Sequence, residues 1–391
     1  MTLHRGRVQP VWAGHPWVFA QAIAHLDGAP TAGDVVDVRC PEGRFLGRGY
    51  WSPSSAIPIR IATRDSNDAL DGASIGRALD RAMALRARFG LPSSQTTGYR
   101  LVHSEGDGLP GLVVDVLGDV GAVQLLTIGM KMREANVFAH VARVARVRTI
   151  IEIANAKAAE REGFASETKV VRGPDREDLA FFERGMEFEL DANITQKTGF
   201  YFDQRDNRAL VEGLAKGAKV LDLYSFAGAF ALFAARGGAR SVLAVDSSAV
   251  AITTASRLSH RHGFAERMAF ERADARQRMI ELARKNERFD VVILDPPKLA
   301  PSVKHLERAR GAYRKLNADA ARLLVPGGML VTCSCSAAMS PDDFVRTATL
   351  GVRDAGRDPT LVHLGQQGID HPVPAAFGEG RYLKCAFLRI L

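Results

Sequence analysis

The strongest constraint on the fold is a regular alternation of apolar runs and helical stretches that begins at Lys219. The apolar runs are KVLDLYSF (219–226), SVLAVDSS (241–248), MAFERADA (268–275), FDVVILDPP (289–297) and MLVTCSCS (329–336), with amphipathic segments between them. Alternation of this kind is typical of a doubly wound, mostly parallel sheet. Two later apolar runs, 360–364 and 383–390, predict two last strands, and the second can enter the sheet antiparallel to its neighbours. The sequence therefore predicts an α/β domain over residues 192–391.

Two smaller regions precede this domain. Residues 1–72 alternate short apolar runs with turns, which is typical of a small β-rich domain. Helical periodicity appears from Ile75 to Phe89, and two strand-like runs then meet at Gly118-Asp119. A helix over 131–144 and a strand over 149–153 follow, so we expect a central α+β domain over residues 73–191.

Charge and composition indicate which kinds of molecule the protein can bind and where it can reside. The 391 residues carry a formal charge of +8, which favours a polyanionic partner, although many basic proteins bind no nucleic acid. The sequence contains no apolar stretch of the ~18 residues that a membrane span needs and no signal-peptide pattern near Met1, so a cytoplasmic protein is expected. Four cysteines without zinc-site spacing predict neither a disulfide framework nor a metal.

Aspartates follow or end four successive strands of the predicted sheet: Asp222, Asp246, Asp274 and Asp295. Ligands of open parallel sheets bind outside the carboxyl ends of the strands. Asp246 could accept hydrogen bonds from both ribose hydroxyls of a nucleoside, and Asp274 could accept one from an adenine amino group. Each aspartate alone is explained as well by capping of the next helix. Four in succession favour a nucleoside ligand, held near the small-residue turn that ends at Gly228.

The ends of the fourth and fifth strands carry the reactive groups. Asp295 is followed by two prolines, which fix the backbone and suit contact with a planar base. Cys333 is best interpreted as a small buried hydrophobic residue, whereas Cys335 lies at the strand end, where a thiolate could act as a nucleophile. Addition of that thiolate to position 6 of a pyrimidine makes position 5 nucleophilic, and an acid near ring N3, such as Asp295, would stabilise the adduct.

The chain resembles a known family, the bacterial enzymes that form 5-methylcytosine in 23S ribosomal RNA with S-adenosylmethionine. The resemblance covers nearly the whole chain and rests on HPWVF (15–19), EGDGLPGLVVD (105–115), KTGFYFDQRDNR (197–208), LDLYSFAGAF (221–230), DPPK (295–298), SCS (334–336), DHPV (370–373) and YLK (382–384). It implies an N-terminal PUA RNA-binding domain, a central domain and a Rossmann-like class I methyltransferase domain. It also implies that the partner is 23S ribosomal RNA.

The resemblance assigns roles by position. It implies that the cofactor is bound by Asp222, Tyr224, Ser225, Phe226 and Gly228 at the methionine end, by Asp246 and Ser247 at the ribose, by Asp274 near the adenine and by Asp295 beside the base. A loop with Lys197, Thr198, Tyr201, Gln204 and Arg205 would close over the cofactor. The alternative is that this segment is an ordinary interdomain linker with aromatic and charged residues. Cys335 takes the position of the nucleophile.

Two departures from the family pattern stand out. Ala229 replaces a second glycine that relatives often show, and Lys298 stands where many RNA 5-methylcytosine enzymes have a product-releasing cysteine. The candidates for RNA contact are Arg5, Arg7, His15 and Trp17, although a core role for Trp17 is at least as reasonable.

The function has two alternatives at this stage. One is methylation of an exocyclic amine, which needs no cysteine, and the other is a non-catalytic RNA-binding protein. The oligomeric state stays open, with a homodimer as one option.

Overall fold

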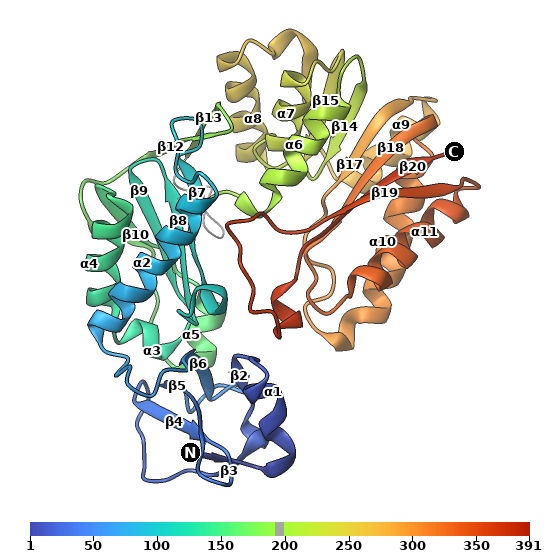
Figure 1. Cartoon of the computed structure of the whole chain (residues 1–391). Helices are drawn as coiled ribbons and strands as arrows, with labels where there is room; N and C mark the ends of the chain where they lie inside the picture. Colours follow the sequence, from blue (N-terminus) through green and yellow to red (C-terminus); the bar gives the residue numbers. More distant parts are fainter. Residues whose placement is uncertain (192–198) are drawn as a thin grey trace. The chain divides into compact units, whose positions relative to one another are not determined.

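The computed structural model describes residues 1–191 and 199–391, which form two compact units (Figure 1). Unit 1 contains Met1–Phe202 and Ile369–Gly380, and unit 2 contains Asp203–Gly368 and Arg381–Leu391. Lys197 and Thr198, both expected to bind the cofactor, lie outside the described residues. The predicted domain boundary at 191/192 stays a prediction. The short return of the chain to unit 1 near its end was not foreseen.

Unit 2 is built on a seven-stranded sheet with the order β16-β15-β14-β17-β18-β20-β19. Its strands are β14 (Lys219–Leu223), β15 (Ser241–Asp246), β16 (Met268–Arg272), β17 (Phe289–Leu294), β18 (Leu324–Ser334), β19 (Pro359–Gly365) and β20 (Lys384–Ile390). The first five are parallel to one another, and β20 pairs antiparallel with both β18 and β19. This topology confirms the predicted α/β class, including the antiparallel last strand.

Helices cover both faces of this sheet (Figure 1). They are α6 (Arg205–Leu214), α7 (Ala229–Arg236), α8 (Ala249–Arg261), α9 (Ala275–Arg284), α10 (Leu306–Ala321) and α11 (Pro341–Asp354), with 3-10 turns η5 (Phe202–Gln204), η6 (Ala265–Arg267) and η7 (Val303–His305). Side-chain caps fix where several of them begin. Ser248, Asp274 and Ser340 each accept a hydrogen bond from a backbone N–H in the first turn of α8, α9 and α11.

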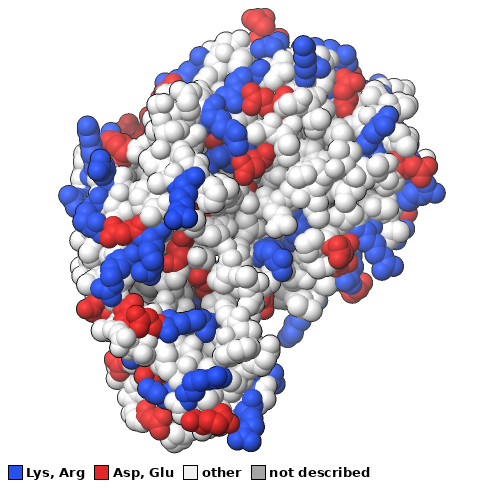
Figure 2. All heavy atoms as spheres, in the orientation of Figure 1, with Lys and Arg blue, Asp and Glu red and all other residues white. Residues whose placement is uncertain are grey.

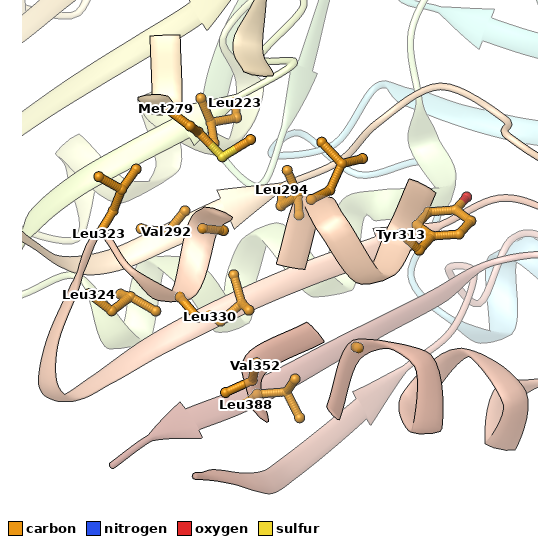
Figure 3. Packing of buried hydrophobic residues seen from close by; sticks show 14 of the residues in the cluster. Leu223, Met279, Val292, Leu294, Tyr313, Leu323, Leu324, Leu330, Val352 and Leu388 are labelled. Atoms are coloured by element: carbon orange, nitrogen blue, oxygen red, sulfur yellow. The ribbon is translucent and has the colours of Figure 1, made fainter. Parts of the chain in front are cut away.

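The core of unit 2 lies between the sheet and these helices (Figure 3). Leu223, Val292, Leu294 and Leu330 on the central strands are fully buried and share one cluster with Tyr313 of α10. Strands covered on both faces need continuous apolar sequence, because neither face meets water. The uninterrupted run VVIL before Asp295 meets this requirement and places the aspartate where the strand leaves the core.

Unit 1 contains two larger sheets and a hairpin. The N-terminal sheet has the order β2-β6-β5-β4-β1-β3 and the central sheet the order β11-β10-β9-β8-β7. The first group comprises β1 (Thr2–Leu3), η1 (Arg5–Arg7), α1 (Val8–Trp12), β2 (Trp17–Val18), η2 (Ala20–Ala22), β3 (Ile23–His25), β4 (Val35–Arg39), β5 (Phe45–Trp51) and β6 (Ile59–Thr63). The central group comprises α2 (Gly72–Arg88), β7 (Gly98–His103), η3 (Ser104–Asp107), β8 (Leu112–Leu117), β9 (Val120–Leu125), α3 (Ile128–Lys131), α4 (Glu134–Ala145), β10 (Thr149–Glu152), α5 (Ala156–Glu162) and β11 (Lys169–Arg172). The hairpin pairs β12 (Asp178–Glu183) with β13 (Met186–Asp191).

A buried ion pair links the segment Ile369–Gly380, which includes η8 (Gly378–Gly380), to the rest of unit 1. The Arg86 guanidinium donates to both oxygens of Asp107 and, at 2.7 Å, to the carbonyl of Asp370. The Asp370 carboxylate accepts from the backbone N–H of Arg100 at 2.9 Å and contacts the His371 ring. Because these groups are buried, each hydrogen bond compensates a charge that would otherwise be costly inside the protein.

Candidate active site

The turn between β14 and α7 forms the centre of the site. Three of its residues have left-handed backbone conformations, with φ of 62° at Tyr224, 49° at Phe226 and 74° at Gly228. A Cβ atom built on Gly228 would lie 2.8 Å from the Cβ of Ala255 on α8, so the turn requires glycine for both its backbone angle and its packing. Left-handed residues other than glycine carry strain, and such strain concentrates at ligand-binding turns.

Two buried polar atoms at this turn have no hydrogen-bond partner among the described residues. Asp222 is 1% exposed, and its Oδ2 accepts a hydrogen bond from the Ala231 N–H of α7 at 3.1 Å. Within the described part of the chain, the other oxygen of Asp222 and the hydroxyl of Ser225 have no hydrogen-bond partner. Burial, with Asp295 and Asp246 nearby, raises the pKa of Asp222 well above its usual value. Unpaired buried acceptors of this kind fit a ligand that brings donors or positive charge.

Asp246 ends β15 and holds the turn from the second strand. Its Oδ2 accepts from the Phe226 N–H at 2.9 Å, and its Oδ1 accepts from the Ser248 N–H at 2.8 Å, while Ser247 is exposed. Each carboxylate oxygen can accept more than one hydrogen bond, so these contacts leave room for ribose hydroxyls.

Asp274 caps α9 by accepting from the Gln277 N–H at 2.9 Å. The capping role that the sequence left open is therefore present. Burial raises the pKa of Tyr224 to about 12, and the negative charge of Asp274 adds to the increase. One side chain thus begins helix α9 and places negative charge near Tyr224.

Asp295 follows β17 directly and is fixed by a short chain of amides. Its Oδ2 accepts from Gln204 Nε2 at 3.0 Å, and Gln204 Oε1 in turn accepts from Asn207 Nδ2 at 2.6 Å. Gln204 was expected in a loop over the cofactor, and the structure places it against the aspartate of the next strand end. Asn207 was not among the residues predicted from the sequence. The signal was present as a Gln and an Asn three residues apart, which share one helix face.

The two cysteines of the fifth strand have different surroundings. Cys333 is fully buried, and its Sγ lies 3.2 Å from that of Cys385 on β20. Burial and the adjacent Cys385 raise the pKa of Cys333 well above its usual value, so its thiol is neutral. Cys335 lies one residue beyond β18 and is partly exposed. Since Leu294 pairs with Thr332 across β17 and β18, Asp295 and Cys335 leave the same edge of the sheet.

The other predicted residues lie as follows. Arg205 begins α6 and is buried, whereas Tyr201 is exposed and belongs to unit 1. Ala229, the departure from the glycine pattern, is the first residue of α7 and is buried.

The predicted RNA contacts divide into two kinds. Arg5 and Arg7 are exposed, and Arg5 pairs with Glu42 at 3.1 Å. The Trp17 indole donates to Glu105 at 2.8 Å, its ring centroid lies 4.6 Å from that of Phe377, and His15 contacts the same phenyl ring. These contacts favour a packing role for Trp17 within unit 1. Figure 2 shows Lys and Arg interspersed with Asp and Glu on the face displayed, so charge alone does not delimit an RNA surface there.

Comparison with known proteins identifies the family. Residues 1–64 match the model of a PUA-like domain, and residues 156–363 match that of an S-adenosylmethionine-dependent methyltransferase. The chain is 37% identical to the ribosomal RNA large subunit methyltransferase I of Shewanella denitrificans, covering 99% of this chain and 98% of the relative. The enzyme of the same name from Aeromonas salmonicida is 35% identical with the same coverage. The chain belongs to this methyltransferase family.

As a family member, the protein is an S-adenosylmethionine-dependent methyltransferase. An S-adenosylmethionine-dependent methyltransferase from Streptococcus mutans has the same fold, with a TM-score of 0.86, 20% identity and coverage of 100% and 99% of the two chains. The Asp222 oxygen and the Ser225 hydroxyl that have no hydrogen-bond partner among the described residues suit a ligand with a cationic end, as this cofactor has.

Within residues 1–191 and 199–391, no helix is long and apolar enough to cross a membrane. That part of the chain also brings no three His, Cys, Asp or Glu side chains together as metal ligands.

Proposed function

We propose that this enzyme forms 5-methylcytosine in 23S ribosomal RNA in the cytoplasm through a covalent adduct between Cys335 and the base. One observation carries the proposal: a partly exposed thiol and a carboxyl group leave adjacent parallel strands at one edge of the sheet. The relatives are named for the large ribosomal subunit, which supports that RNA as the substrate. The PUA-like domain and the charge of +8 suit an RNA partner.

The residues at the strand ends have different roles in the proposed reaction. The Cys335 thiolate adds to C6 of cytosine, which turns C5 into an enamine-like nucleophile. Asp295, held by Gln204 and acting as the protonated acid, donates its proton to ring N3 as the thiolate adds and recovers that proton when the thiolate leaves. S-adenosylmethionine supplies the electrophilic methyl group. The C5 proton then leaves to a base, and its electron pair expels the thiolate and restores the aromatic ring.

Replacement of each cysteine by alanine tests the proposal. RNA from cells that lack the gene and carry either variant is digested, and its 5-methylcytosine is measured by mass spectrometry. We expect Cys335→Ala to abolish the modification. Cys333→Ala is the matched control and should retain it, because the Cys333 thiol is buried against Cys385.

Three outcomes would count against the proposal. Unimpaired 5-methylcytosine in the Cys335→Ala variant would exclude the thiol mechanism. A methyl group on an exocyclic amine would point to the alternative reaction of enzymes with an Asp-Pro-Pro segment. RNA containing 5-azacytidine should trap an adduct on Cys335, and an adduct on Cys333 would reverse the assignment.

A further inference from the structure

A lysine is fully buried on the strand next to the two cysteines. Lys384 is the first residue of β20, and it stands in the apolar run that ends the chain. Its register partner on β18 is Ser334. Lysine is almost never fully buried unless its charge is paired, so a compensating group is expected close to the ammonium.

One of the two hydrogen-bond partners of the ammonium belongs to the residue that follows Cys335. Lys384 Nζ donates to the carbonyl of Ser336 at 2.7 Å and to the carbonyl of Tyr382 at 2.8 Å. Lys384 therefore pairs in the sheet with the residue before Cys335 and hydrogen-bonds the residue after it. An ammonium has three donors, and in the described part of the chain no carboxylate lies within ion-pairing distance of this one.

The electrostatics of Lys384 agree with this geometry. Burial lowers the pKa of Lys384 to about 8, and a negative charge on Cys335 acts in the opposite direction, while Lys298 lowers the pKa further. The interaction is reciprocal, so a cation at Lys384 lowers the pKa of the Cys335 thiol.

We propose that Lys384 is a positioning residue that keeps Cys335 as a thiolate before the RNA binds. It acts through the thiol, since its buried side chain does not reach solvent. The proposal deepens the proposed function, because it supplies the activation that a cysteine nucleophile needs. It also gives a reason for a lysine inside an apolar strand.

The other ionisable groups around Cys335 do not provide the same activation. Lys298 is exposed, so water screens its charge. Tyr313 of α10 contacts the Ser336 hydroxyl at 3.3 Å, and burial raises its pKa, so it is a neutral neighbour. Asp295, at the end of β17, is negative when ionised and would disfavour a thiolate.

The test is the pH dependence of alkylation of Cys335 by iodoacetamide in the full-length protein, followed by mass spectrometry of the peptide that contains Cys335. The Lys384→Met variant preserves length and volume and removes the charge. We expect its alkylation midpoint to rise by about 1–2 pH units, which makes alkylation at pH 7 roughly tenfold slower or more. Lys298→Met is the matched control and should shift the midpoint by less than about half a unit, because exposed charges interact weakly.

An unchanged midpoint in a folded Lys384→Met protein would overturn the proposal. Folding is checked by the melting temperature and by S-adenosylmethionine binding. If that variant does not fold, the same alkylation experiment on the enzyme without substitutions tests the proposal. The pH midpoint of Cys335 alkylation should then lie below the ordinary thiol pKa of about 8.5, and a midpoint at or above this value would refute activation by Lys384. A Cys335→Ala enzyme that still forms 5-methylcytosine would remove the proposed function and leave the alkylation result intact, so the two failures are distinguishable.

Discussion

Replacing Asp222 by asparagine should stabilise the cofactor-free protein while weakening cofactor binding. Asp222 is buried, one of its oxygens has no hydrogen-bond partner in the described part of the chain, and Asp295 and Asp246 repel its charge. Asparagine keeps the shape and the acceptor for the Ala231 N–H while removing the charge. The variant therefore separates the role of the charge from that of the backbone contact.

The expected gain in stability follows from the Asp222 oxygen that has no hydrogen-bond partner among the described residues. A buried, unsatisfied polar group costs about 1–3 kcal/mol, and more when charged. In a domain of this size each kcal/mol corresponds to about 2–4 °C in melting temperature, so we expect a rise of about 2–12 °C without cofactor. Loss of a charge-assisted contact of about 1.5–3 kcal/mol should weaken S-adenosylmethionine binding by about 10- to 150-fold.

The effect on stability has a defined pH dependence. Because the pKa of Asp222 is raised in the folded state, the native protein binds a proton here more tightly than the unfolded chain, whose aspartate has a pKa of about 3.9. The native contribution of Asp222 is therefore most favourable below about pH 4 and is lost as the pH rises toward the folded pKa. The stabilisation by Asp222→Asn should be small at pH 4 and grow toward neutral pH.

The assay is thermal unfolding between pH 4 and 8, with isothermal titration of S-adenosylmethionine at pH 7.5. Asp274→Asn is the matched control for thermal unfolding, because asparagine caps helices about as well as aspartate and this site is exposed. An Asp222→Asn protein that is less stable than the original, or that binds the cofactor equally well, would refute the reasoning.

Two further predictions concern packing, one in each unit. Gly228→Ala should cost about 1–3 kcal/mol of folding free energy by denaturant titration, because its Cβ would lie 2.8 Å from that of Ala255 at a φ of 74°. Gly213→Ala in α6 is the control and should be neutral or slightly stabilising, because nothing lies within 4 Å of the added atom; equal losses would contradict the steric argument. Arg86→Met should cost about 3–5 kcal/mol by leaving Asp107 buried without its cation, whereas the exposed Arg143, paired with Asp80, should cost less than about 1 kcal/mol on replacement by methionine. Similar losses at the two arginines would show that burial of the pair is not what matters.

The sequence predicted the parts of the fold that depend on local pattern. Continuous apolar runs separated by helical periodicity identified β14 to β18, since strands covered on both faces must be apolar throughout. It also indicated the turn before α7, because the close approach of backbone to α8 at Gly228 tolerates no side chain. The resemblance to family motifs supplied the predicted roles of the site residues, and relatives that match over the full length confirmed the family.

Contacts between residues far apart in the sequence could not be predicted in this way. The bond from Gln204 to Asp295 spans 91 positions, and no local pattern reveals which loop amide meets which strand-end carboxylate. The same holds for Asp370, which lies late in the chain and yet forms part of the Arg86 and Asp107 cluster in unit 1.

The sequence by itself thus determined the α/β class, the catalytic candidates and their order along the chain, because hydrophobic burial and turn geometry act over a few residues. Only the tertiary structure showed that the thiol of Cys333, already expected to be buried, packs against Cys385, and where the charge of Lys384 lies. Ionisation depends on burial and on charges brought close by strand pairing, such as that of Ser334 with Lys384, and these arise only when the sheet is assembled.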